Sequence, residues 1–151
     1  MAVLYQHEQR GLVILAASGL AVALSLVLAT IVEASAARLT LFFVVAILAV
    51  CAFLFSSLTI ELSESSLSWR FGPGLLRKQV ASAEISNAVV TKTRVIHGWG
   101  VHLTRNGWLY NVSGFGAVQV SLRSGKTFLL GSDEPEQLCL ALQRAIQSTA
   151  R

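Results

Sequence analysis

The sequence contains two long stretches without a single Asp, Glu, Lys or Arg, from Gly11 to Val32 and from Leu39 to Ile60. An α-helix rises 1.5 Å per residue, so about 20 apolar residues cross the roughly 30 Å hydrocarbon core of a bilayer. Both stretches reach that length, and only the segment Glu33 to Arg38 separates them. We therefore expect two membrane spans, at about residues 11–32 and 39–57, that form a transmembrane helical hairpin.

The composition agrees with an integral membrane protein. Only 13% of the residues are charged, against about 25% in ordinary soluble domains. We assign residues 1–57 to an N-terminal segment and the hairpin, and residues 58–151 to one domain outside the bilayer, because some 90 residues suffice for a single modest core.

An alternative for the first span is a cleaved signal peptide, because Ala34-Ser35-Ala36 has the small residues of a cleavage site. The apolar core of a signal peptide is about 7 to 15 residues long, shorter than the stretch found here. A second apolar stretch also follows at once, so an uncleaved anchor fits better.

Basic residues near the spans predict their orientation, because cytoplasmic loops carry an excess of Lys and Arg. The connection between the spans holds only Arg38, whereas Arg10 precedes the first span and Arg70, Arg77 and Lys78 follow the second. We therefore expect a multi-pass protein of the cell (inner) membrane with both termini in the cytoplasm.

Small residues recur at every fourth position of the first span, and such a stripe lets another helix approach closely. The second span offers small residues of its own and lies only a short connection away. Antiparallel packing within the chain is the expected arrangement, and a homodimer through the same stripe is the alternative. The stripe consists of Ala17, Ala21, Ser25 and Ala29, and the facing residues are expected to be Ala46, Ala49 and Ala52.

After the second span the pattern changes to short alternating segments, which are typical of half-buried β-strands. Apolar residues alternate with polar ones over residues 58–62 and 67–71, and Gly72-Pro73-Gly74 then predicts a turn. Further strands are expected over residues 75–80 and 88–95.

Two hairpins are expected in the second half of the domain. Asn106-Gly107 favours a two-residue type I′ turn that would pair Arg105 with Trp108. The next turn is expected to be a three-residue loop with Gly125 as a bulge, which pairs Val120 with Phe128 and places the apolar side chains on one face.

The C-terminal region predicts an amphipathic helix over about residues 134–147. Pro135 stands in its expected first turn, and apolar residues then recur at helical spacing. The chain thus ends with about seven short strands followed by one helix.

The order of these motifs resembles the bacterial pleckstrin-homology-like (PH-like) domains of small membrane proteins, over Leu58 to Ile146. The resemblance implies an α+β membrane protein in which a bent, partly open antiparallel β-barrel or sandwich of about seven strands is closed by the C-terminal helix. It implies little about activity, because fold alone does not fix function. The residues that carry it are 67–74, Gly98-Trp99-Gly100-Val101, Tyr110 to Gly114, Val118 to Leu122 with Gly125-Lys126, and Leu130 to Glu136.

The expected function is a non-catalytic, membrane-anchored interaction or scaffold module that presents a binding surface at the cytoplasmic face. The expected partners are the bilayer itself and a membrane or cytoplasmic protein. Aromatic side chains are the candidate partner contacts, namely Trp99, Trp108 and Tyr110, and Trp99 is favoured because glycines flank it.

The alternative is a domain that senses anionic lipid headgroups. Eukaryotic relatives of the resembled fold use a basic loop between their first two strands, but Glu64-Ser65-Ser66 stands there in this chain, so that site is not carried over. Basic residues elsewhere would replace it, each contributing about 1 kcal/mol at an anionic leaflet. The candidates are Arg77, Lys78, Lys92, Arg94 and Arg105.

The sequence gives no support for an enzyme or for a bound cofactor. It contains no Gly-rich phosphate loop, no pair of catalytic carboxylates and no Cys/His spacing suited to zinc. Nucleic-acid binding is not expected either, because acidic residues are interspersed among the ten basic residues that follow the second span.

Overall fold

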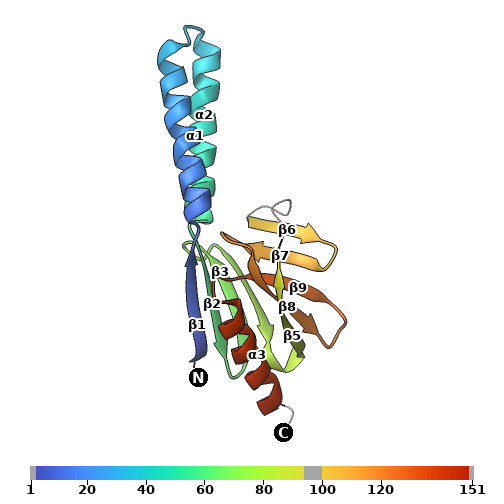
Figure 1. The fold of residues 1–151 in the computed structure, drawn as a ribbon. Coiled ribbons are helices and arrows are strands. Elements are labelled where there is room, and N and C mark those ends of the chain that lie inside the picture. The colour runs from blue at the N-terminus through green and yellow to red at the C-terminus, as the bar shows by residue number, and fades with distance from the viewer. Residues whose placement is uncertain (1–2, 94–99, 150–151) are drawn as a thin grey trace.

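The computed structural model describes residues 3–93 and 100–149, and its architecture is α+β (Figure 1). Two long helices project side by side from one end of a β-rich body, and both chain ends lie toward the opposite end. The helices are α1 (Leu12–Ile31) and α2 (Ser35–Leu54), and a third helix, α3 (Pro135–Thr149), packs on the β-rich body.

The β-rich body contains two sheets. The first is antiparallel, with the strand order β1 (Val3–Arg10), β2 (Ser57–Ser63), β3 (Ser66–Phe71) and β4 (Leu76–Ala81). A short 3₁₀ helix, η1 (Ser82–Glu84), leads into the second sheet. The strand order there is β5 (Ile85–Lys92), β8 (Gly116–Leu122), β9 (Thr127–Gly131), β7 (Gly107–Asn111) and β6 (Gly100–Thr104).

The apolar inner faces of the two sheets form one core with α3. Leu58, Ile60 and Leu62 alternate along β2 toward this core, and Leu138 and Leu142 of α3 reach it from the other side. The predicted strands at 58–62, 67–71 and 75–80 are therefore confirmed, and so is the C-terminal helix.

The expected partly open barrel or sandwich is observed as two separate sheets. Within the described residues their edge strands β4 and β6 do not pair with each other, so there is no closed barrel. The second sheet is also not purely antiparallel, because β9 lies between β8 and β7 and runs parallel to β7. The tight β8–β9 hairpin folds back beside β7, which brings the two strands together in the same direction.

Strand β1 was not predicted from the sequence. It pairs with β2 from Val3 opposite Ser63 to Arg10 opposite Ser57, with one irregularity between Val3 and Tyr5. The helical pair α1–α2 is thus inserted between two neighbouring strands of one sheet. Gly11 forms the joint, where its N–H donates to the Ser56 carbonyl oxygen and a Cβ atom would lie 2.5 Å from the Phe55 carbonyl oxygen.

Both α1 and α2 are long and apolar enough to span a membrane, by length and composition. They form the expected antiparallel pair, and most of their large side chains are exposed. Ser25 and Ala29 of the predicted stripe are buried and Ala21 is half-buried, but Ala17 is exposed and Ser18 takes its place in the seam. A four-residue repeat turns through about 400° on a helix, so the stripe drifts about 40° per step and leaves the seam.

The second helix also faces its partner with a different set of residues. Ala46 and Ala49 are exposed, so of the three predicted small residues only Ala52 is half-buried. The half-buried positions spaced along α2 are Leu41, Val45, Leu48 and Ala52.

The predicted register of the first hairpin is wrong. In the structure Leu103 pairs with Trp108 and Thr104 with Gly107, which makes Arg105 and Asn106 the turn residues. A type I′ turn needs positive φ at both central residues, and no described residue other than glycine has positive φ. Gly107, at φ +103°, instead directly follows the turn and pairs with Thr104.

The second hairpin is confirmed as predicted. Val120 pairs with Phe128 and Val118 with Leu130. Gly125 adopts φ +82° and donates its N–H to the Leu122 carbonyl oxygen, so the three-residue loop is formed.

Candidate functional site

The two sheets diverge between their free edges β4 and β6, and this gap holds a cavity of about 230 Å³ that is open to solvent. The cavity exceeds the roughly 150 Å³ of an apolar cavity known to bind benzene. We call it the interlayer groove. It is lined by Phe55, Trp69, Phe71, Leu76, Arg77, Lys78, Val101 and Tyr110.

Cross-strand pairing places the walls of the interlayer groove. Trp69 lies opposite Lys78 on β3 and β4, and Val101 lies opposite Tyr110 on β6 and β7. Directly opposite residues share one face of a sheet, so each pair points into the space between the sheets. The Trp69 and Tyr110 ring centroids lie 5.1 Å apart, which joins the two walls at the bottom of the groove.

Lys78 and the indole N–H of Trp69 are polar groups within this largely apolar lining. The Lys78 Nζ atom lies 5.7 Å from the centroid of the Tyr110 ring, within range of a cation–π interaction. Trp69 is only 3% exposed, and its indole N–H has no hydrogen-bond acceptor within the described part of the chain. A buried donor without a partner carries an energetic cost, which an acceptor on a bound group would relieve.

The apolar inner face of the β6–β7 hairpin continues beyond the groove. Leu103 and Trp108 form the next cross-strand pair after Val101 and Tyr110 on the same face. Leu103 is 71% exposed and Trp108 is 47% exposed. Exposed apolar side chains that adjoin an apolar groove are typical of interaction sites.

The predicted aromatic contacts thus occupy different environments. Tyr110 is buried in the groove wall, where it contacts Trp69 and Phe128, whereas Trp108 is partly exposed beside the groove. Trp99 lies outside the described residues, so its prediction is untested.

The structure brings only part of the predicted basic set together. Arg77 and Lys78 are neighbours on β4 and point to opposite faces; Arg77 lies opposite Arg70 on the outer face. Lys92 is at the end of β5, the other edge of the second sheet from β6. Arg105 lies in the β6–β7 turn, and Arg94 is outside the described residues.

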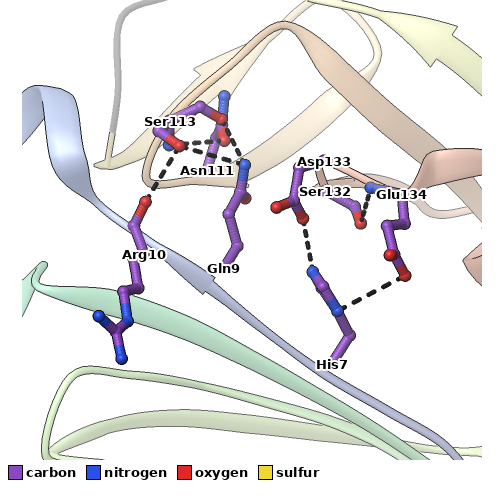
Figure 2. A network of polar contacts seen from close by, with 8 residues as sticks. All are labelled: His7, Gln9, Arg10, Asn111, Ser113, Ser132, Asp133 and Glu134. Carbon is purple, nitrogen blue, oxygen red and sulfur yellow. Dashed lines mark hydrogen bonds and ion pairs between the residues drawn. The ribbon is translucent and has the colours of Figure 1, made fainter.

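A polar network that the sequence analysis missed fixes β1 to the rest of the body (Figure 2). His7 Nε2 lies 2.5 Å from an Asp133 carboxylate oxygen, and His7 Nδ1 lies 3.6 Å from a Glu134 carboxylate oxygen. Gln9 donates to the Ser113 carbonyl oxygen at 2.8 Å. The alternation of Tyr5, His7 and Gln9 is the signal that could have identified β1 as a strand.

Among the described residues outside α1 and α2, two ionisable groups have shifted pKa values. Burial raises the pKa of the Tyr5 hydroxyl, and the nearby Glu134 carboxylate adds to the shift. Burial likewise raises the pKa of the Cys139 thiol, which donates to the Ala88 carbonyl oxygen at 3.3 Å. Both groups therefore favour their neutral forms, and neither faces the interlayer groove.

Within the described ranges, no group of three His, Cys, Asp or Glu residues is placed to hold a metal ion. Comparisons of the chain with protein families, curated proteins and solved structures gave no match.

Proposed function

We propose that this protein is a non-catalytic, membrane-anchored interaction module that binds a segment of a partner protein in the interlayer groove. Helices α1 and α2 form its transmembrane hairpin, and the β-rich body faces the cytoplasm with both termini. The observation that carries the proposal is the apolar groove, which opens beside the base of α2 because Phe55, directly after that helix, lines it.

The surface of the helical pair supports the membrane assignment. Large apolar side chains such as Leu20, Phe43 and Phe53 are exposed along both helices. Monomeric soluble proteins rarely expose a continuous apolar surface of this kind, whereas lipid would cover it.

Charge at the two ends of the helical pair supports the orientation. Arg10 ends β1, one residue before Gly11 and α1, and Arg77 and Lys78 of β4 line the groove together with Phe55, which directly follows α2. At the far tip, the Arg38 guanidinium donates to the Val32 carbonyl oxygen at 2.9 Å and so stays with the helix ends. The excess of cations at the base is the cytoplasmic pattern.

The chemistry of the groove suggests the partner segment. In the described part of the chain β4 is an edge strand that an added strand could pair with, and the apolar walls offer space for alternate side chains of that strand. Lys78 and the unpartnered Trp69 N–H favour an oxygen acceptor. We therefore expect an extended apolar segment that carries an acidic residue.

Topology is the first test. We expect Ala34→Cys, at the tip of the hairpin, to react with a membrane-impermeant maleimide from outside intact cells, in a C51A background. Ser124→Cys, in the β8–β9 turn, is expected to react only after the membrane is permeabilised. The opposite pattern would reverse the orientation, and external labelling of both would contradict the hairpin.

Site-specific photocrosslinking tests the binding surface. Benzoylphenylalanine at Leu103 is expected to give a discrete adduct with a partner protein in native membranes, whereas the same group at exposed Val89, on the opposite edge of the sheet, should not. Lys78→Glu should reduce the adduct several-fold, and Gln79→Glu, on the outer face of the same strand, should leave it unchanged. Equal adducts at both positions would contradict the proposal.

A second candidate function, sensing of anionic lipid headgroups, is favoured by the adjacent cations Arg77 and Lys78 beside the base of the hairpin. In the crosslinking experiment it would appear as a lipid adduct at Leu103 in place of a protein adduct. Lys92 is far along the other sheet and does not contribute to this cluster.

A further inference from the structure

The turn between β3 and β4 lies against the last turn of α2. A Cβ atom on Gly72 would lie 2.6 Å from the carbonyl oxygen of Phe53 and 2.8 Å from that of Leu54. The Gly72 N–H also donates to the Ser57 carbonyl oxygen at 2.8 Å. This turn is therefore fixed at the level where α2 ends, by backbone contacts that leave it little freedom to move away.

The same turn presents an uncovered apolar tip. Its sequence, Gly72-Pro73-Gly74-Leu75-Leu76, contains no charged residue. Leu75 is 74% exposed, and Leu76 is also exposed at the mouth of the interlayer groove. In water this tip would be unfavourable, because burying a leucine side chain is one of the larger apolar gains a residue can make.

Cations lie immediately below the tip. Arg77 follows Leu76 on β4 and stands opposite Arg70 on β3. Arg10 ends β1 at the base of the helical pair. An apolar tip with cations directly behind it matches a bilayer interface, where acyl chains lie next to anionic headgroups.

We infer that the turn Gly72–Leu75 inserts into the interface of the same bilayer and seats the β-rich body on the membrane, with Leu75 at the acyl boundary and Arg77 and Arg70 at the phosphates. The inference rests on the proposed transmembrane hairpin. Its consequence is that the groove, which Leu76 lines, opens at headgroup level. A partner segment must then approach along the membrane surface.

Depth-dependent fluorescence quenching tests whether this turn lies in the membrane interface. A small fluorophore is attached to Cys at one position at a time, in full-length C51A/C139A protein whose fold has been checked by circular dichroism. The vesicles contain phosphatidylcholine and phosphatidylglycerol at 3:1 with nitroxide-labelled lipid. The labelled positions are Leu75→Cys for the seat, Phe43→Cys in the middle of α2, and exposed Leu140→Cys on α3 as the matched control.

We expect shallow nitroxides to quench Leu75 at least threefold more than Leu140, and deep nitroxides to quench Phe43. If Phe43 is quenched while Leu75 behaves like Leu140, insertion of the turn into the membrane interface is contradicted, whereas the transmembrane hairpin is still supported. If Phe43 is not quenched, the hairpin and the seat both fail. Equal shallow quenching of Leu75 and Leu140 would mean that the body has no defined seat and would also overturn the inference.

Discussion

At the scale of single residues, two glycines with positive φ allow the energetic cost of backbone strain to be distinguished from the cost of a steric clash. Gly107 and Gly125 adopt φ +103° and φ +82°. A Cβ atom on Gly107 would meet the Thr127 carbonyl oxygen within bonding range, whereas one on Gly125 would meet nothing within 4 Å. The two positions therefore differ mainly in the space around them.

We expect Gly107→Ala to destabilise the β-rich body far more than Gly125→Ala. The second change should cost only the left-handed conformation, about 1 kcal/mol, while the first must also push β7 away from β9. Thermal unfolding followed by tryptophan fluorescence in detergent measures both. Equal losses would mean that the β7–β9 contact is not as close as described.

The raised pKa of Cys139 predicts a dependence of stability on pH. The folded state keeps the thiol proton to a higher pH than the unfolded state, whose ordinary thiol pKa is 9.0. The stabilisation is therefore complete below pH 9 and is lost as the pH rises from 9 through the folded-state pKa. We expect the melting temperature to fall more steeply above pH 9 in the C51A protein than in C51A/C139A. Parallel curves would contradict the burial of this thiol.

At the scale of elements, the seam between α1 and α2 yields a prediction that the small-residue stripe alone would not. Ala29 is buried in the seam, whereas Ala17, from the same stripe, is exposed. Ala29→Leu should overpack the seam at a cost of about 1–3 kcal/mol, and Ala17→Leu should be tolerated. Disulfide crosslinking between cysteines placed on the two helices, in a C51A background, measures whether the distance between α1 and α2 has increased. Equal effects would show that the helices pack through another face.

The helices and most strands could be predicted because each follows a local pattern. The β8–β9 hairpin is an example, because alternation and one glycine decided its register. The predicted register of β6–β7 was wrong because Asn106-Gly107 is compatible with two turn types. The choice between these turn types depends on the approach of Thr127 from a distant strand. The parallel pairing of β7 with β9 is likewise a non-local outcome that no local pattern encodes.

The candidate site was less predictable than the fold. Lys78, Trp108 and Tyr110 were chosen from the sequence as single residues, but only the tertiary arrangement places them around one groove. Trp69 was not selected among the predicted partner contacts, because its alternation within a strand is typical of any core position. The PH-like resemblance stays a prediction.

At the scale of the whole molecule, β1 makes the helical pair an insertion within one sheet. Residues 58–151 alone would lack β1 and leave the β2 edge open, so we expect that fragment to aggregate. A chain that joins Arg10 to Ser57 through Asn-Gly should instead fold and remain soluble, because those residues are paired and a two-residue turn fits between them. Size-exclusion chromatography of the two proteins makes the comparison. Similar behaviour of both would mean that β1 contributes little.

The position of β1 also has a consequence for synthesis. A ribosome produces β1 before α1 and α2, and the pairing partner β2 emerges only after both apolar helices have been completed. The first sheet cannot close until α1 and α2 have reached their final places beside each other. If α1 and α2 form the proposed transmembrane hairpin, pairing of β1 with β2 waits for membrane insertion. A chain whose helices fail to insert would then expose β1 and one edge of β2 to the proteases that remove misassembled proteins.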